Sequence, residues 1–500
     1  MHHLSEQEVL RKKKKEELEA LNINPYPATT FVTNTTVQAI LDNYTKDLEN
    51  YQNVAIAGRL MNRRIMGSAS FAELQDASSK IQLYVHRDTL CPDQDKSFYN
   101  TVFKKLLDIG DIIGVQGLVF TTQVGEITIR VTRLTLLAKA LKPLPIVKED
   151  DKQVYDAFAD PEQRYRQRYI DLLVNPSVRN IFQQRTKLIS TIRQYLNAQG
   201  YEEVETPILQ PIHGGALARP FKTHHNALDV PLYLRIANEL YLKRLIVGGY
   251  EGVYEFAKDF RNEGMSRFHN PEFTMLEVYV AYKDYVWMME QTEAMIEQVA
   301  LDLHGTTDIQ VGSHTIHFQK PWRRLTMFEA IQHFTGIDIS AMDEAALRNV
   351  AQRLGIPLVA AANKAKIMDD IFSTQCEPHL IQPTFITDYP VEMSPLAKQH
   401  RNNPALVERF EVICNGKEIC NAFSELNDPI EQRKRLEEQL QWGQRGDEEA
   451  MALDEDFLQA LSYGMPPTAG LGVGIDRLTM IMTNATSIQE VIFFPQMRPK

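Results

Sequence analysis

Five short apolar-rich segments, divided by polar turns, lie at residues 54–60, 70–74, 81–85, 112–117 and 127–131. Their length and their content of β-branched residues predict short β-strands. A helical patch near residues 97–107 interrupts the series after the third segment. This order predicts a small Greek-key barrel of the OB type, with any other small β-domain as the alternative.

The rest of the chain has a different pattern. Residues 5–21 pattern as a charged helix, which Pro25 and Pro27 end. A long helix at 176–199 opens a mixed region of strands and helices, in which the mainly helical residues 323–380 are expected to be an insertion. The predicted parts are an N-terminal helical extension (1–53), the OB-type domain (54–142), a proline-containing charged linker (143–175) and a larger domain (176–500).

The composition is that of an ordinary globular protein, with 44% hydrophobic and 24% charged residues. Because 500 residues exceed one compact core, two or three domains are expected. No apolar run approaches the roughly 20 residues needed to cross a bilayer, and no signal peptide is expected. Four cysteines, with Cys414 and Cys420 as the only close pair, favour structural thiols and a cytoplasmic protein.

The net charge of −11 is unfavourable for binding nucleic acid, but phosphate contacts are local. Residues 54–140 carry a slight excess of Lys and Arg, which is a weak indication of a binding face; a solvated surface is the alternative. The basic run from Arg11 to Lys15 has the same two interpretations, and the solvated helix face is the one we favour.

One predicted hairpin carries side chains suited to a nucleotide: Arg261, Glu263, His269 and Phe273. A guanidinium can bind a phosphate or a carboxylate through two hydrogen bonds, and an aromatic ring can stack on a purine. An ordinary hairpin with surface charges is the alternative.

A second motif is glycine-rich. Gly470, Gly472 and Gly474 alternate along a strand candidate, and Asp476 and Arg477 begin a predicted helix. Alternating glycines let a strand approach a ligand closely, and a helix N-terminus favours anions. The spacing fits neither a Rossmann nor a P-loop motif.

Three motifs follow one another in the larger domain. A long helix precedes a strand that ends at Pro207, then come Arg-x-Glu with His-x-x-x-Phe, and finally Gly-x-Gly-x-Gly-x-Asp-Arg. In this order they resemble the class II aminoacyl-tRNA synthetases over residues 176–495, and the barrel extends the resemblance to residue 54. The resemblance implies an α+β fold, with an OB-type barrel before an antiparallel catalytic sheet flanked by helices. It also implies a homodimer built around the first motif.

Residues 214–221, 234–244 and 418–428 resemble the lysine branch, the lysyl-tRNA synthetases. The expected reaction activates L-lysine with ATP to lysyl-adenylate and pyrophosphate, then transfers lysine to the 3′ end of tRNA(Lys). The chemistry agrees, because lysine brings two ammonium groups and its pocket needs several carboxylates. Solvated surface acids are the alternative.

The resemblance also implies roles for single residues around lysine. Glu239 and the Gly215 backbone would hold the α-ammonium, and Arg261 with Asn421 would hold the α-carboxylate. The residues implied for the side-chain ammonium are Glu277, Tyr279 and Glu425.

For ATP, the resemblance implies that Arg261 and Arg477 are the catalytic residues, at the α- and γ-phosphates. Glu411 and Glu418 are implied as Mg²⁺ ligands, with about three ions accompanying ATP and two of them held through these carboxylates. No side chain is expected to act as a nucleophile or general base. The residues implied around the base and phosphates are Phe273 under adenine, Glu263 at the base edge and His269 near the phosphates.

The barrel is expected to read the anticodon by stacking and edge recognition. Phe71, Gln82 and Glu126 stand where the family places the residues that contact anticodon uridines. For Phe71, filling of the barrel core is the alternative.

The sequence departs from the family at Phe268, where many relatives have an arginine immediately before the histidine, so Arg267 receives no firm role. Rival interpretations are an aspartyl- or asparaginyl-type synthetase, a protein-lysylating paralogue and a non-catalytic RNA-binding relative. Glu239, Glu277 and Glu425 argue against the first. The barrel argues against the second, and the retained arginines and metal acids argue against the third.

Overall fold

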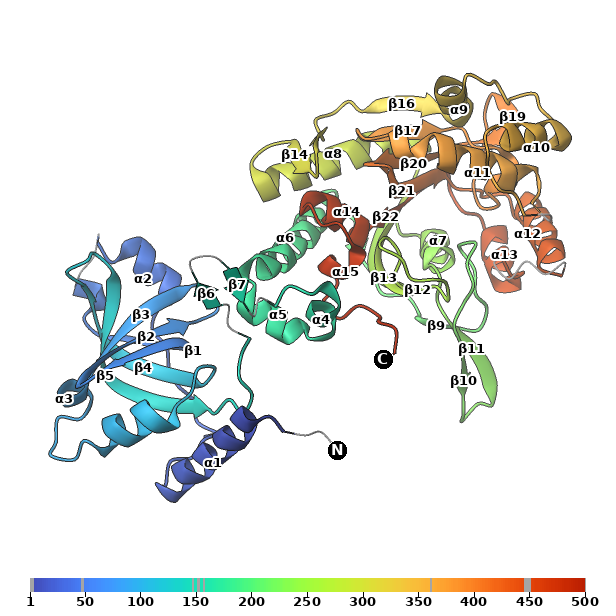
Figure 1. Ribbon diagram of the computed structural model, residues 1–500. Coiled ribbons are helices and arrows are strands. Elements are labelled where there is room, and N and C mark those ends of the chain that lie inside the picture. The colour runs from blue at the N-terminus through green and yellow to red at the C-terminus, as the bar shows by residue number, and fades with distance from the viewer. Residues whose placement is uncertain are drawn as a thin grey trace. The chain divides into compact units, whose positions relative to one another are not determined.

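The computed structural model describes residues 4–45, 49–145, 148–150, 153–155, 158–359, 362–444 and 451–499. The chain forms two compact units, Met1–Phe158 and Ala159–Lys500 (Figure 1). The division falls within the stretch predicted as a linker. None of the helices in the described ranges combines the length and apolar character needed to span a bilayer.

The N-terminal unit is built on a closed five-stranded barrel with the order β1-β2-β3-β5-β4. Alternate residues of each strand point inward, and Leu60, Leu83 and Val115 are fully buried in its core. The barrel confirms the predicted OB-type architecture. Its elements are α1 (Glu6–Ala20), α2 (Val37–Asn43), η1 (Glu49–Tyr51), β1 (Val54–Met66), β2 (Ala69–Gln75), β3 (Lys80–His86), α3 (Arg87–Leu90), the π-helix η2 (Phe98–Leu106), β4 (Ile112–Thr121), β5 (Ile127–Ala138), β6 (Lys148–Asp150) and β7 (Gln153–Tyr155).

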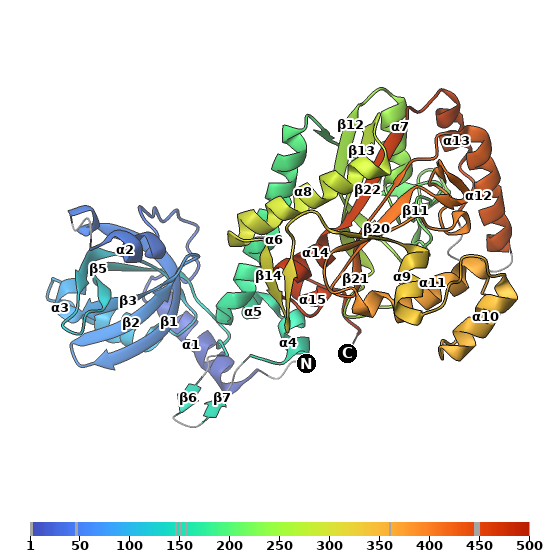
Figure 2. The same cartoon turned by 90° about the horizontal axis from the view of Figure 1, so that it is seen from above.

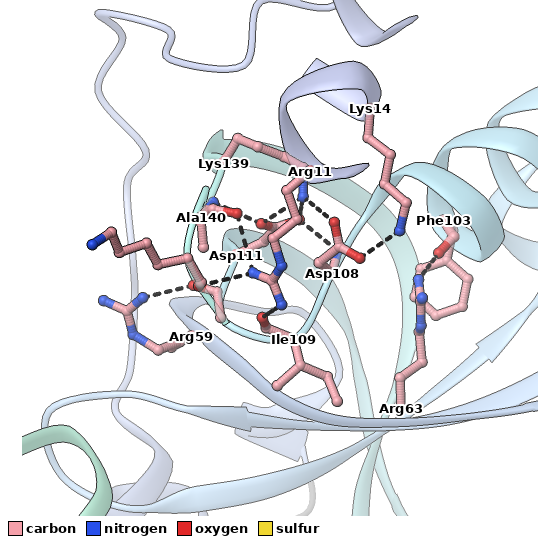
Figure 3. Close-up of polar contacts among 12 residues, drawn as sticks. Arg11, Lys14, Arg59, Arg63, Phe103, Asp108, Ile109, Asp111, Lys139 and Ala140 are labelled. Atoms are coloured by element: carbon pink, nitrogen blue, oxygen red, sulfur yellow. Dashed lines mark hydrogen bonds and ion pairs between the residues drawn. The ribbon is translucent and has the colours of Figure 1, made fainter. Parts of the chain in front are cut away.

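Helix α1 begins at a capping box made by Ser5 and Glu8 and is tied to the barrel by buried polar contacts (Figure 3). Arg11, only 6% exposed, inserts its guanidinium between the ends of two barrel strands. It donates hydrogen bonds of 2.9, 3.1 and 3.0 Å to the carbonyl oxygens of Ile109, Ala140 and Lys142.

A buried ion cluster continues from this anchor. Lys139 lies 2.6 Å from Asp108 and 3.0 Å from Asp111, and Lys14 of α1 lies 2.5 Å from Asp108. The basic run that opens the chain is therefore partly internal, since Arg11 and Lys14 fix α1 to the barrel.

The C-terminal unit contains an eight-stranded sheet, whose strands lie in the order β16 (Arg323–Thr326), β17 (Thr384–Thr387), β20 (Arg409–Cys414), β21 (Lys417–Ser424), β22 (Thr468–Gly474), β13 (Glu272–Ala281), β12 (Gly252–Phe260) and β8 (Glu202–Glu203). Its pairing is antiparallel from β17 to β12, as predicted for the catalytic sheet, and parallel at the two edges. Helices α6 (Pro176–Ala198) and α8 (Tyr285–His304) pack on one face, where Ile192, Met288 and Ile296 meet Leu276 and other buried residues (Figure 2). On the opposite face, α7 (Glu239–Val247) packs on β12 and β13, where Leu242 and Ile246 meet Val253 and Ala281, and polar side chains lie beside this cluster.

Helices α9, α10 and α11 enclose a second apolar core, which includes Met327, Leu347 and Phe372. They occupy the stretch predicted as a helical insertion. The elements up to this point are α4 (Pro161–Arg166), α5 (Arg168–Val174), α6 (Pro176–Ala198), β8 (Glu202–Glu203), β9 (Leu209–Gln210), β10 (Lys222–His225), β11 (Val230–Leu234), α7 (Glu239–Val247), β12 (Gly252–Phe260), β13 (Glu272–Ala281), α8 (Tyr285–His304), β14 (Asp308–Val311), β15 (His314–His317), β16 (Arg323–Thr326), α9 (Met327–Thr335), α10 (Glu344–Arg353) and α11 (Lys364–Gln375).

The remaining chain returns to the main sheet. The four cysteines, including Cys414 and Cys420, are free and buried, which agrees with structural thiols. The elements are η3 (Glu377–His379), β17 (Thr384–Thr387), η4 (Val391–Met393), β18 (Gln399–His400), β19 (Asn403–Val407), β20 (Arg409–Cys414), β21 (Lys417–Ser424), α12 (Pro429–Gln444), α13 (Glu455–Ser462), β22 (Thr468–Gly474), α14 (Ile475–Met482) and α15 (Ile488–Val491).

Candidate active site

Strand register brings the predicted site residues onto one face of the sheet. Glu277 of β13 pairs with Gly472 of β22, Gly472 pairs with Asn421 of β21, and Asn421 pairs with Glu411 of β20. Directly paired residues of antiparallel strands point to the same face. A row of candidate site residues therefore crosses four strands, on the face opposite α6 and α8.

A cavity of about 340 Å³ lies over this face. Glycines of β22 form the floor of this cavity, because neighbouring side chains leave little or no room for a Cβ atom at these positions. A Cβ at Gly470 would lie 2.0 Å from Glu425 Oε1 and 2.7 Å from Tyr279 Cε1, and one at Gly472 would lie 3.2 Å from Met275 Cε. The site residues that line the cavity are Gly215, Glu239, Arg261, Glu263, His269, Phe273, Glu277, Tyr279, Glu411, Glu418, Asn421 and Arg477.

Arg261 and Phe273 face each other across the hairpin of β12 and β13. The guanidinium carbon lies 5.0 Å from the centre of the Phe273 ring. The Arg261 Nε is buried and has no hydrogen-bond partner among the described residues. A buried guanidinium donor without a partner suits an anionic ligand, because leaving it unpaired is costly.

Arg477 and His269 form the opposite wall of this end of the cavity. Arg477 donates to His269 Nε2 at 3.1 Å and to the Glu418 carbonyl oxygen at 2.9 Å, and its guanidinium lies 3.3 Å from Glu418 Oε2. Burial, and then the charge of Arg477, lowers the pKa of His269. A neutral imidazole beside a guanidinium leaves positive charge for an anion.

Asp476, the neighbour of Arg477, ties three elements together. It lies 2.7 Å from Arg185 of α6 and accepts a 2.7 Å hydrogen bond from the Thr274 amide of β13. These contacts set the start of α14, and hence the position of Arg477, relative to the hairpin.

Carboxylates gather at the other end of the cavity. Glu239 and Glu277 are each 6% exposed, and the Tyr279 hydroxyl donates a 2.9 Å hydrogen bond to Glu277. Burial raises the pKa of Glu277 well above its ordinary value, and Asp259 and Glu239 add to the shift. Gly215 adopts φ +88° and lies against Glu239, where a Cβ would be 3.2 Å from the Glu239 Cβ.

Glu425 lies beneath this end rather than in the lining. Its carboxylate sits under Gly470 and forms an ion pair with Lys243, a residue of α7. Burial raises the pKa of Glu425 well above its ordinary value, against the opposing charge of Lys243.

Glu411 and Glu418 lie on adjoining strands at the side of the cavity. Arg409 lies 2.5 Å from Glu411, and the Tyr389 hydroxyl donates to Glu411 at 2.9 Å. Burial raises the pKa of Glu411 to about 7, with the negative charge of Glu418 adding to the shift. Within the described ranges, no group of three or more metal-ligating side chains stands together, so a cation here would need further oxygen ligands from a bound molecule.

Sequence reasoning missed two cations of the site. Lys243 follows Glu239 by one helical turn, and Arg409 precedes Glu411 by two residues on a strand. Both spacings place the cation beside the carboxylate, so helical and strand periodicity could have found them.

The residues predicted to read RNA lie on the outer surface of the barrel. Phe71 is half-buried, is absent from the apolar core, and contacts Tyr84 at a ring distance of 5.4 Å. Tyr84 in turn meets Phe120, on which Arg130 lies at 4.9 Å. The structure therefore excludes core filling for Phe71 and provides an aromatic surface with an adjacent cation.

Gln82 and Glu126 extend this surface. The Gln82 amide donates a 2.7 Å hydrogen bond to Glu126, and its oxygen accepts one of 2.9 Å from Thr128. The three predicted residues are thus brought to one side of the barrel, on β2, β3 and the turn before β5.

The family model described as "tRNA synthetases class II (D, K and N)" matches residues 160–498, and the model "OB-fold nucleic acid binding domain" matches residues 54–137. A protein of Porphyromonas gingivalis named "Lysine--tRNA ligase" is 59% identical over 499 residues, 99% of this chain and 86% of that protein. Proteins of the same name from Christiangramia forsetii and Azobacteroides pseudotrichonymphae are 58% and 56% identical, covering 100% and 99% of this chain and 87% and 99% of their own lengths.

Proposed function

Because the chain belongs to the class II tRNA synthetases, and within them to the lysine–tRNA ligases, we propose that its cavity holds lysine and ATP end to end. The enzyme uses ATP to join lysine to tRNA. Lysyl-adenylate is the intermediate, and pyrophosphate is released when it forms. The observation that carries the proposed binding mode is the polarity of one cavity, with buried carboxylates at one end and two arginines at the other.

Lysine would lie with its two ammonium groups on the carboxylates. Glu239 and the Gly215 backbone would take the α-ammonium, since Gly215 lies directly against Glu239. Glu277, Tyr279 and the underlying Glu425 would take the side-chain ammonium. Burying an unpaired carboxylate is energetically costly, and in the complex an ammonium group would pair with each buried carboxylate and reduce this cost.

The α-carboxylate of lysine would then point toward the arginines. Arg261 would bind it together with Asn421, whose side-chain oxygen already accepts a 3.0 Å hydrogen bond from Arg409. Among the described residues the Asn421 amide nitrogen has no acceptor of its own, so it can donate to the lysine carboxylate. Arg261 would therefore contact both reacting groups, the lysine carboxylate and the α-phosphate.

ATP would occupy the arginine end. Phe273 would stack under adenine with Glu263 at the base edge, and His269 would lie near the phosphates beside Arg477. Arg261 at the α-phosphate and Arg477 at the γ-phosphate would neutralise charge as the lysine carboxylate attacks the α-phosphorus in line. Alignment and charge neutralisation supply the catalysis, since no side chain need become a nucleophile.

Glu411 and Glu418 fit a role as Mg²⁺ ligands. Burial and a neighbouring carboxylate raise the pKa of Glu411 to about 7, and this unfavourable charge would be relieved by a divalent cation. A hard cation held by two carboxylates would share its remaining oxygen ligands with ATP phosphates and neutralise them. The number of ions, about three by resemblance to the family, belongs to this proposal.

The barrel would bind the anticodon through its aromatic surface. Phe71 and Tyr84 offer rings for stacking, and Gln82 and Glu126 offer hydrogen-bonding edges. The OB-fold nucleic acid binding match supports this assignment.

A homodimer would form around the first motif. Four apolar side chains that follow β8 and Pro207 are 36–48% exposed, and a partner subunit would cover them. They are Ile208, Leu209, Ile212 and Leu217. Light scattering at micromolar concentration tests this proposal, because a monomer mass would contradict it.

The binding mode is tested by ATP–pyrophosphate exchange with Mg²⁺, screening all twenty amino acids without tRNA. We expect exchange with lysine and none with aspartate or asparagine, because the cation at the carboxylate end, Lys243, is already engaged by two carboxylates. Exchange with aspartate or asparagine would overturn the assignment of this end to an ammonium group.

A further inference from the structure

Lys243 is a fully buried cation beneath the carboxylate end of the cavity. Its ammonium lies 2.5 Å from the Glu239 carboxylate, one helical turn earlier in α7. It also forms an ion pair with Glu425, which has no other hydrogen-bond donor among the described residues. The rings of Phe423 and Phe457 cover the ammonium, with centroids 5.5 and 6.0 Å away. The ammonium is therefore dry and fixed by two carboxylates and two rings.

These ion pairs change the charge that the cavity offers to a ligand. Glu239 and Glu277 line this end, Glu425 lies beneath it, and Lys243 compensates one of the three negative charges that these groups carry when ionised. With all three carboxylates ionised, two uncompensated charges remain, one for each ammonium group of lysine. The α-carboxylate would have its own partner in Arg261. The charge of the ionised pocket thus matches the substrate only with Lys243 in place.

Burial and the neighbouring charges shift the pKa values of this cluster in opposite directions. Burial lowers the pKa of Lys243, but the two carboxylates together raise this pKa by more than burial lowers it. The net shift is therefore upward, and the ammonium stays charged. Burial raises the pKa of Glu239 and Glu425, and Lys243 opposes both shifts. The other charged or titratable groups near the cluster are Arg409 on β20, Glu277 and Tyr279 on β13, and Asp259 on β12.

Resting on the lysine-binding role proposed above, we propose that Lys243 is a positioning residue of the lysine pocket, which keeps Glu239 and Glu425 ionised and at a fixed separation before lysine binds. One cation joins a carboxylate that lines the cavity to one beneath its floor. Without it, the two buried carboxylates repel each other and share a proton, which lysine must displace in order to bind. Lys243 itself does not contact the reacting atoms.

The test replaces Lys243 by methionine, which keeps the length of the side chain and removes the charge. In ATP–pyrophosphate exchange, Lys243→Met raises the KM for lysine by about 30-fold, with kcat changed less than about threefold and the KM for ATP unchanged. Calorimetry of lysine binding, in buffers of different ionisation enthalpy, shows about one more proton released than in the wild type at neutral pH.

Lys139→Met is the matched control, because Lys139 is also a fully buried ammonium paired with two carboxylates, but in the other unit. It lowers the melting temperature and leaves the lysine KM and proton release at wild-type values. Should Lys243→Met not fold, Lys243→Gln keeps a donor between the carboxylates without the charge and carries the same expectations.

The proposal is overturned if a folded, uncharged Lys243 variant binds lysine with wild-type affinity and proton release, or if Lys139→Met raises the lysine KM equally. Absence of lysine-dependent exchange in the wild-type enzyme is a different failure, since it would refute the lysine-binding role itself.

Discussion

At the scale of single residues, Glu277 has the least compensation among the buried carboxylates that line the cavity within the described ranges. Its recorded hydrogen-bond donor is the Tyr279 hydroxyl, at 2.9 Å, and no ion pair to Glu277 is found within the described ranges. Burial raises its pKa well above the ordinary value for glutamate. On the proposed binding mode, an ammonium group of lysine would offset the energetic cost of ionising Glu277 in this pocket.

Glu277→Gln tests the value of this charge for binding. The substitution removes the charge but keeps the shape, so kcat/KM for lysine in ATP–pyrophosphate exchange should fall by about 100-fold or more, as expected for a lost charged hydrogen bond. The KM for ATP should stay within about threefold of the wild type, because ATP lies at the other end. Equal losses for lysine and ATP would indicate a collapsed pocket instead.

The same variant tests the pH dependence of stability. The folded-state pKa of Glu277 is raised, so the native protein holds a proton that the unfolded chain has already released. Stability of the unliganded enzyme should therefore fall as pH rises from the ordinary glutamate pKa to the raised one. Glu277→Gln lacks this loss, so at about pH 8 without lysine it should melt at a higher temperature than the wild type, with a smaller difference at about pH 5. A lower melting temperature of the variant at about pH 8 contradicts the prediction.

At the scale of elements, strand β22 can form the floor of the cavity because the residues that it presents to the cavity are glycines. Its glycines alternate on the open face of the sheet, while Leu471 and Val473 point into the core on the other face. The adjoining helix α14 starts where the strand ends, and Asp476 fixes that junction to α6 and β13. One continuous segment thus forms both the floor of the cavity and the wall that carries Arg477.

Gly470→Ala should disable the lysine end of the cavity. The added Cβ would lie 2.0 Å from Glu425 Oε1 and 2.7 Å from the Tyr279 ring, so both side chains must move. We expect kcat/KM for lysine to fall by about 100-fold and stability to fall by about 1–3 kcal/mol, measured by exchange kinetics and urea unfolding. A wild-type lysine KM in a folded variant would show that these positions tolerate displacement.

The attachment of helix α1 to the barrel depends on one buried residue, Arg11. Arg11→Met would leave three carbonyl oxygens, at residues 109, 140 and 142, without their donor, at a cost of about 3 kcal/mol. Amide hydrogens of α1 should then exchange much faster with solvent, measured by mass spectrometry. Lys13→Met, on the exposed face of the same helix, is the control and should leave exchange in α1 unchanged.

At the scale of the whole molecule, the two units have separate cores and separate proposed tasks. The residues proposed for the amino acid and ATP belong to the unit that begins at Ala159, and the aromatic surface proposed for RNA belongs to the barrel. On this proposal the first chemical step needs only one unit, while transfer to tRNA uses both. A substitution in the barrel should therefore impair transfer to tRNA without impairing activation of lysine.

Phe71→Ala should separate the two steps. Loss of one stacking ring costs about 1–3 kcal/mol per base, so kcat/KM for tRNA in aminoacylation should fall by about 5- to 150-fold. ATP–pyrophosphate exchange without tRNA should be unchanged, and it serves as the internal control. An unchanged aminoacylation rate at limiting tRNA would exclude Phe71 from the RNA surface.

The sequence by itself determined the elements and their chemistry. Strand-length apolar segments predicted the barrel, because local periodicity requires no knowledge of distant contacts. The order of the three motifs, through the family that they resemble, predicted that Arg261 and Arg477 lie at an anion site. The tertiary structure alone decided which distant residues meet. Glu239, Glu277 and Glu425 come from a helix, a strand and the end of another strand, and only register and packing bring them together. Phe71 shows the same limit: period two shows that its neighbours in the chain face the other way, but only closure of the barrel decides which face is inside.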